Sequence, residues 1–138
     1  MPYQDYKHLH LTSSIIGCAM KVHSYLGPGF PEIIYHRSLI VELEKAKLNY
    51  VSEYARDVRY EGVWVGLRRL DLLVEGVVLL ELKATTEIKN VDYNQVLNLL
   101  KIFEIEVGIL LNFGKASLEF KRFAHTINPI NLRNPRNP

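Results

Sequence analysis

The sequence predicts an α/β domain in which a mixed β-sheet is flanked by α-helices. Two observations support this prediction. Apolar residues recur at helical spacing before residue 50, and strand patterns with turn signals follow, interrupted by one further helical segment. The predicted order is two helices, three strands, one helix and two strands. A chain of 138 residues, 48% hydrophobic and 23% charged, is large enough to form one such domain.

Two helices are predicted in the first third of the chain. Thr12 or Ser13 can cap the first helix, whose apolar side chains recur every three or four positions. Gly27-Pro28-Gly29 ends this helix, because glycine tolerates a left-handed cap and proline cannot continue the hydrogen-bond ladder. The second helix is expected to start near Pro31, where a proline costs little, and to run to about Lys47.

Strand patterns begin after the second helix. The segment from Val51 to Tyr60 is polar enough for an exposed or edge strand. Glu61-Gly62 is a two-residue turn signal, and the return strand is expected to run from Val63 through to Val74. A further turn at Glu75-Gly76 leads into a strand from Val77 to Lys83.

The last third of the chain predicts one helix and two strands. The helix covers Val91 to Phe103, a buried strand covers Val107 to Phe113, and an alternating strand covers Ser117 to Ala124. We therefore expect a single domain over residues 11–125. Residues 1–10 are expected to form a loosely held arm and residues 126–138, rich in Asn, Pro and Arg, a disordered tail.

Composition excludes several classes of protein. The single cysteine, Cys18, rules out an intramolecular disulfide and a cysteine-based zinc or iron–sulfur site. No apolar run approaches the roughly 18–20 residues that span a bilayer, and the N-terminus does not resemble a secretory signal. A cytoplasmic protein without membrane contact is the expectation. The net charge of +2 is too small to indicate a nucleic-acid partner by itself.

Three charged residues, Asp71, Glu81 and Lys83, stand among leucines and valines. An unpartnered buried charge costs several kcal/mol, so such residues are normally exposed or matched to a specific partner. Because side chains alternate along a strand, Glu81 and Lys83 share one face of the predicted sheet. Taken alone, they could be an ordinary charged pair. Together with Asp71, they suggest a site that holds a metal ion and a phosphodiester.

The turn between the last two strands of the hairpin decides whether the carboxylates can meet. A two-residue loop would place Asp71 and Glu81 on opposite faces of the sheet, because facing residues share a side. A three-residue loop, which would pair Leu73 with Val77 and Arg69 with Glu81, would place both carboxylates on one face. The site hypothesis therefore predicts an odd-length loop or a bulge.

Several separated motifs, in order, resemble the pattern of the small bacterial proteins called the GxxExxY family. These motifs are Val22-His23, Leu26-Gly27-Pro28-Gly29, Gly29-Phe30-Pro31-Glu32-Ile33-Ile34-Tyr35, Asp71-Leu-Leu-Val, Glu81-Leu-Lys83 and Gly108-Ile-Leu-Leu-Asn112-Phe113-Gly114. The resemblance covers about residues 11–123. That family is placed within the PD-(D/E)XK nuclease superfamily, which implies a restriction-endonuclease-like core with a mixed sheet between helices.

The resemblance implies roles for particular residues. Asp71, Glu81 and Lys83 would be the metal-and-water residues, and Glu32 would complete the acidic cluster from its helix. Gln95, on the helix after the Glu-x-Lys strand, would correspond to an additional motif of the superfamily.

Two positions depart from the superfamily's pattern. Leu70 stands where a proline would precede the aspartate, which the superfamily tolerates. Leu99 stands where a tyrosine is usual, four residues after Gln95. That part of the substrate or metal shell is therefore not predicted from the resemblance.

Three further residues are candidates for contact with substrate or for support of the site. Tyr35 follows Glu32 by three positions on a helix, so the two could reach the site together, although a tyrosine there is more often core. Arg69 could steer phosphate or bridge to Glu81. His23 lies on an apolar stripe, where a hydrogen-bonded core histidine is the commoner outcome.

These residues predict a nuclease that hydrolyses phosphodiester bonds in DNA with Mg²⁺ or Mn²⁺. Asp71, Glu81 and Glu32 would hold the metal, since hard cations prefer oxygen ligands. Lys83 would position the attacking water, because two neighbouring carboxylates favour its charged form. The alternative is a nuclease-like module that binds nucleic acid or protein without cleaving it. A homodimer or a protein partner could be required for substrate choice.

Overall fold

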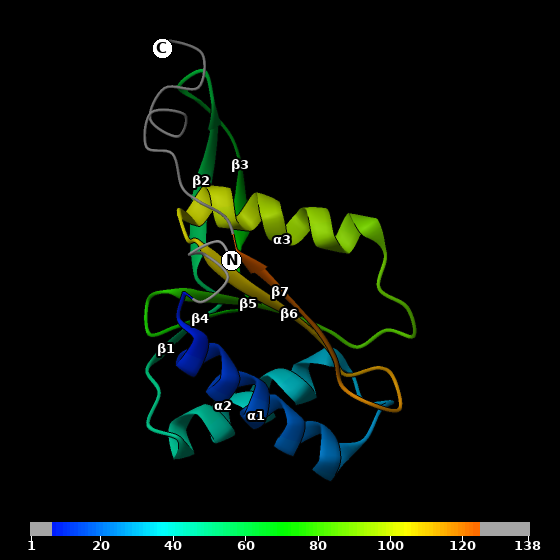
Figure 1. The fold of residues 1–138 in the computed structure, drawn as a ribbon. Helices are drawn as coiled ribbons and strands as arrows, with labels where there is room; N and C mark the ends of the chain where they lie inside the picture. The colour runs from blue at the N-terminus through cyan, green and yellow to red at the C-terminus, as the bar shows by residue number, and fades with distance from the viewer. Residues whose placement is uncertain (1–6, 125–138) are drawn as a thin grey trace.

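A computed structural model describes residues 7–124 and shows a sheet between two layers of helices (Figure 1). The five-stranded sheet has the order β1-β4-β5-β6-β7, in which only β5 and β6 are parallel, and β2 and β3 form a separate two-stranded sheet. This confirms the predicted mixed sheet between helices. The elements are α1 (Leu9–Leu26), α2 (Glu32–Lys45), β1 (Tyr50–Ser52), β2 (Ala55–Tyr60), β3 (Val63–Arg69), β4 (Leu72–Val74), β5 (Val78–Lys83), α3 (Asn90–Phe103), β6 (Val107–Asn112) and β7 (Glu119–Ala124).

The two faces of the sheet carry separate hydrophobic clusters. Leu80 and Leu82 of β5 pack with residues of α1 and α2, whereas Leu79 packs with residues of α3. This alternation follows from the two-residue period of a strand. Each fully buried leucine contributes about 1.5–3 kcal/mol, so the two clusters hold the helices to the sheet. No helix within residues 7–124 combines the length and the apolar character that a membrane crossing requires.

The start of α1 differs from the expectation. The helix begins at Leu9, so Thr12 lies inside its first turn, where its hydroxyl donates to the Leu9 carbonyl rather than capping the helix. The preceding residue Lys7 is held to the domain, because its side chain pairs with Glu106 and its carbonyl accepts from Arg122. The expected loose arm is therefore wrong for residues 7–10. Residues 1–6 and the expected tail at 126–138 lie outside the described residues.

The later elements follow the predicted order with small differences at their ends. Gly27 and Gly29 both have positive φ, and Pro31 precedes the first residue of α2, as predicted. The helix α2 ends at Lys45, two residues before the expected end. The helix α3 and the strands β6 and β7 lie within two residues of their expected bounds.

The two strands expected at residues 51–60 and 63–74 are each broken in the middle. Glu53 adopts a left-handed conformation with φ of 53°. Across the break, the Leu70 amide donates to the Tyr54 carbonyl and the Glu53 amide donates to the Asp71 carbonyl. The pairs Ser52 with Leu72 and Ala55 with Arg69 therefore belong to one continuous register.

The segment is thus one long bent hairpin. Its base, β1 and β4, joins the main sheet, and its outer part, β2 and β3, projects beside α3 as an arm (Figure 1). Five strands stand where three were expected, because the bend divides two of them.

The loop between β4 and β5 has three residues, Glu75 to Val77, as the odd-length prediction required. Leu73 pairs with Leu79 and not with Val77, so the expected register is wrong by two residues. Glu75 and Gly76 both adopt left-handed conformations, and this places the turn one residue later than expected. Continuing the observed register sets Asp71, in place of Arg69, opposite Glu81.

Candidate functional site

Asp71 and the Glu81–Leu82 segment of β5 are joined by a reciprocal pair of hydrogen bonds. The Asp71 amide donates to Glu81 Oε2 at 2.8 Å, and the Leu82 amide donates to Asp71 Oδ2 at 2.8 Å. The bend of the long hairpin falls at Asp71, which leaves β4 there and frees its amide for this contact. Each carboxylate thus has one oxygen committed to a backbone amide, and its second oxygen is available to another partner.

Both carboxyl groups are costly to ionise, mainly because both are buried. Burial, followed by the charge of Asp71, raises the pKa of Glu81 to about 8, although the Asp71 amide and Lys83 oppose the shift. Burial also raises the pKa of Asp71, against the opposing effects of the Leu82 amide, His36 and Lys83. The folded protein therefore favours a proton, or another cation, at this pair near neutral pH.

Glu32 brings a third carboxylate toward the pair from the first residue of α2. Burial, and then the charge of Asp71, raise the pKa of Glu32, while Lys83 lowers it. An open cavity of about 470 Å³ lies between α2 and the bend of the hairpin. It is lined by Glu32, Ile33, His36, Glu53, Arg69 and Asp71.

Lys83 and Gln95 lie on the α3 side of this region. Lys83 shares the face of Glu81, and its Nζ lies 3.6 Å from Asp92 Oδ1 of α3. Gln95, three residues after Asp92 on the same helix, is half-buried. Leu99, which replaces the usual tyrosine, is fully buried in the hydrophobic cluster against α3. That position contributes to packing rather than to the polar site.

Tyr35 does not reach the site with Glu32, so that expectation is wrong. The Tyr35 side chain is completely buried, stacks on Phe113 with ring centroids 4.7 Å apart, and donates its hydroxyl to the Gly27 carbonyl. It also accepts a hydrogen bond from the Phe30 amide. Tyr35 thus fixes the glycine-containing turn that precedes α2.

His23 and Arg69 have different environments. His23 is buried, and its Nε2 lies 2.8 Å from the Lys115 carbonyl, which ties α1 to the loop after β6. A hydrogen-bonded core position is the outcome that the apolar stripe favoured for His23. Arg69 lines the cavity but pairs with Glu53 at 3.6 Å, so the alternative of a bridge to Glu81 is wrong.

The sequence analysis did not single out His36 or Glu53, although both line the cavity. His36 is buried, its Nε2 lies 2.9 Å from Ser52 Oγ, and its charge lowers the pKa of Asp71. The signal that could have identified His36 is its spacing of four residues from Glu32, which places both on one helical face. Glu53 carries no comparable signal, because its place depends on the bend.

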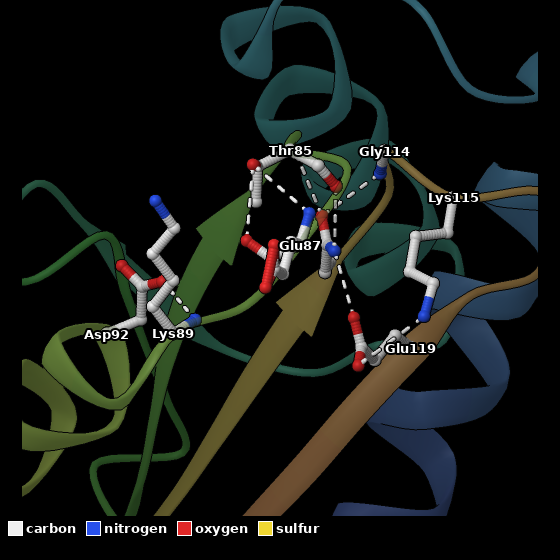
Figure 2. A network of polar contacts seen from close by, with 8 residues as sticks. Thr85, Glu87, Lys89, Asp92, Gly114, Lys115 and Glu119 are labelled. Carbon is white, nitrogen blue, oxygen red and sulfur yellow. Dashed lines mark hydrogen bonds and ion pairs between the residues drawn. The ribbon is translucent and has the colours of Figure 1, made fainter.

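A second polar cluster at the same end of the sheet was also missed (Figure 2). Asn112 Oδ1 accepts from the amides of Thr85 and Gly114 at 3.0 Å each, and its Nδ2 donates to the Thr85 carbonyl. Nδ2 also donates to Glu119 at 3.0 Å. A Cβ at Gly114 would lie 2.4 Å from the Thr85 backbone, so only glycine fits there. We call Asn112, Thr85, Gly114 and Glu119 the amide corner.

Within the described range 7–124, no three Asp, Glu, His or Cys side chains are arranged as a metal-binding group. The chemistry of Asp71, Glu81 and Glu32 nevertheless fits a hard divalent cation. All three are oxygen donors, each has a raised pKa, and Asp71 and Glu81 are each left with one oxygen free of the reciprocal bonds. We call Glu32, Asp71, Glu81 and Lys83 the acid corner.

Comparisons with known proteins agree with this architecture. The family model described as the PD-(D/E)XK nuclease superfamily matches residues 9–123. The crystal structure of a protein called SSO0001 is similar with a TM-score of 0.53 and 16% sequence identity, which bears on the fold alone. The match covers 94% of this chain and 60% of that one, so this chain spans about three-fifths of its length. A comparison with curated proteins gave no match.

Proposed function

We propose, because this chain belongs to the PD-(D/E)XK nuclease superfamily, that it is a divalent-metal-dependent nuclease that hydrolyses phosphodiester bonds in DNA. The observation that carries the proposal is the reciprocal hydrogen bonding of Asp71 with Glu81 and Leu82, with Lys83 on the same face of β5 as Glu81. The order of the motifs further supports membership of the GxxExxY family and a single domain over residues 11–125.

In this proposal, Asp71, Glu81 and Glu32 hold Mg²⁺ or Mn²⁺. Burial raises the pKa of each carboxyl, and the charge of Asp71 raises the pKa of Glu32 and Glu81 further, so a divalent cation would relieve a cost that the folded protein already carries. When bound, such a metal activates water and neutralises charge on the phosphoryl group. Asp71 and Glu81 keep their orientation through the backbone amides that they accept.

Lys83 would position the attacking water and offset negative charge on the phosphate. Its ammonium group is oriented by Asp92 of α3 at 3.6 Å, and it is close enough to the acid corner to lower the pKa of Glu32, Asp71 and Glu81. A role in electrostatic stabilisation therefore fits this position better than a role as general base.

A nuclease-like module that binds nucleic acid without cleaving it is the second candidate function. It is favoured by one observation, the lack of a ready-made three-carboxylate metal group within residues 7–124. In this alternative, the hydrogen bonds between the carboxylates and the backbone amides would be purely structural.

The test is cleavage of plasmid and linear DNA with and without Mg²⁺ or Mn²⁺. We expect divalent-dependent cleavage that falls by about 100-fold or more in Lys83→Ala and Asp71→Asn proteins, because each change removes charge aimed at the reaction. Lys21→Ala and Asp57→Asn are matched controls, since both residues are exposed and lie outside the acid corner. Activity that survives both site changes would reject the mechanism. DNA binding without any cleavage would favour the module.

A further inference from the structure

A groove of about 380 Å³ runs between the β2–β3 arm and the C-terminal half of α3. It has apolar walls, two cationic side chains and an amide, and no acidic residue lines it. The lining residues are Val58, Val65, Gly66, Leu67, Arg68, Asn98, Lys101 and Ile102. Neither Arg68 nor Lys101 forms an ion pair with any of residues 7–124. Two cations in the groove are therefore open to an anionic ligand.

The groove is held open by contacts between the arm and α3. Arg56 donates to the Ile102 carbonyl at 3.1 Å and lies over the Phe103 ring at 5.3 Å. Arg56 pairs with Arg68 in the β2–β3 register, and Arg56 contacts α3, so both side chains lie on the face of the arm that is turned to α3. Arg56 thus holds the arm against α3, and the strand register places Arg68 on the same face.

Strand β3 connects this groove to the acid corner. Arg68 and Arg69 are adjacent, so their side chains point to opposite faces of the arm. Arg68 enters the groove, and Arg69 lines the cavity that also contains Asp71 and Glu32. The groove and the cavity beside the proposed cleavage site are therefore lined by neighbouring residues of one strand.

We propose that this groove binds the sugar-phosphate backbone of one strand of the nucleic-acid substrate, away from the phosphate that is cleaved. Arg68 and Lys101 contact phosphate oxygens, Asn98 adds a hydrogen bond, and the apolar walls pack against the sugars. A positively charged groove that follows the backbone is typical of proteins that bind a single strand. This inference rests on the proposed nuclease function and specifies how its substrate is held.

A second copy of the chain is a poorer occupant of the groove. In a symmetric dimer the same patch would meet itself, which would bring Arg68 and Lys101 toward their own copies. Like charges that face each other at an interface are costly. A phosphate backbone supplies the opposite charge, so charge complementarity favours nucleic acid.

The test is binding of a fluorescent single-stranded DNA, measured by anisotropy over a range of salt concentrations in EDTA. We expect Arg68→Gln/Lys101→Gln to weaken binding about tenfold at low salt and to reduce the slope of log K against log salt by about 1.4. The control Lys21→Gln/Lys45→Gln removes the same charge from α1 and α2, across the sheet, and should bind like the wild type. Arg68→Lys/Lys101→Arg keeps both charges and should retain wild-type affinity.

The outcomes separate this inference from the proposed function. Wild-type affinity in the Arg68→Gln/Lys101→Gln protein, or an equal loss in the control, would overturn the groove assignment even if cleavage still depends on Lys83. A wild-type protein that binds no DNA would overturn both. Sedimentation that shows a wild-type dimer which dissociates in the groove variant would assign the surface to self-association and reject the inference.

Discussion

The acid corner and the amide corner lie at the same end of the sheet but differ in how their polar groups are matched. Lys83 and Asn112 are direct neighbours on the parallel strands β5 and β6. Asn112 makes four hydrogen bonds to neutral backbone groups and to Glu119, which use both of its side-chain polar atoms. Asp71 and Glu81 instead carry like charges beside each other, and both have a raised pKa.

This difference is the one expected between a structural polar cluster and the functional site that we propose. Buried polar groups are normally satisfied, as in the amide corner, where the network joins the ends of two strands. Carboxyl groups held together against their repulsion indicate a site arranged for a cation. Substitutions that exchange only the polar atoms should therefore have opposite consequences at the two corners.

The largest change in the free energy of unfolding is expected for Asn112→Ala. This change removes every bond of the amide corner that involves the side chain, and leaves the Thr85 and Gly114 amides without their acceptor. We expect the free energy of unfolding to fall by about 3 kcal/mol, because unsatisfied buried groups retain their desolvation cost. Urea unfolding measures this change, with exposed Asn98→Ala as the control. A loss below about 1 kcal/mol would show that the corner is not a structural network.

The substitution Glu81→Gln should have an intermediate effect on the free energy of unfolding, and it should stabilise the protein rather than destabilise it. The unfolded pKa of a glutamate is about 4.3, and burial raises the pKa of Glu81 to about 8. The folded wild type therefore binds the extra proton between these values, and its stability falls as the pH rises through them. Glutamine can still accept the Asp71 amide but cannot ionise. In EDTA, the variant should be more stable than the wild type at pH 8 by on the order of 2 kcal/mol, and this advantage should shrink toward pH 5.

Urea unfolding across this pH range measures the Glu81→Gln effect. The same measurement with Mg²⁺ is a second test, because Mg²⁺ at pH 8 should stabilise the wild type more than the variant. Parallel stability curves for the two proteins, with and without Mg²⁺, would contradict a charge conflict in the acid corner.

The smallest effect is expected for Glu119→Gln, the same exchange made in the amide corner. The new amide can still accept from Asn112, and the change removes only the partly exposed pair with Lys115 at 3.8 Å. We expect the free energy of unfolding to change by less than about 1 kcal/mol, with no change in its pH dependence. A pH-dependent gain like that of Glu81→Gln would mean that both corners carry unrelieved charge.

The elements with strong periodicity were predictable from sequence. Both early helices and α3 have long runs with a single period, and β6 is a short continuous run of buried residues; each appears within a few residues of its expected position. The start of α1 was not predictable, because it depends on Lys7, which is held by residues about a hundred positions away. Local capping signals at Thr12 and Ser13 could not reveal that contact.

The bend of the long hairpin was not predictable either. No glycine or proline marks the break, and Glu53 adopts a left-handed conformation that non-glycine residues rarely take. On the opposite strand Leu70 is fully buried against α3, so tertiary packing sets the bend. The odd loop at 75–77 could be inferred, because the site hypothesis required Asp71 and Glu81 on one face.

The directions of the side chains at the candidate site could not be predicted from the sequence. Tyr35 and Glu32 share a helical face in sequence, yet Tyr35 points into the core while Glu32 lies at the first turn beside the hairpin. Asn112 belonged to a recognised motif but had no assigned role. Its contacts to Thr85 exist only because β5 and β6 end side by side.

The bent hairpin also has a consequence for the order of folding. Residues 50–74 pair with one another through a two-residue turn, with one register shift between Val58 and Arg59, whereas β5 and β6 meet only after the α3 crossover. Loop-closure entropy favours the local ladder first, and the short β4–β5 loop then brings Glu81 to Asp71. Glu32 can join only when α2 docks on the sheet. We expect the carboxylates to repel one another most strongly in this last step, so that high pH without a divalent cation would slow the docking of α2 more than it slows the formation of the hairpin.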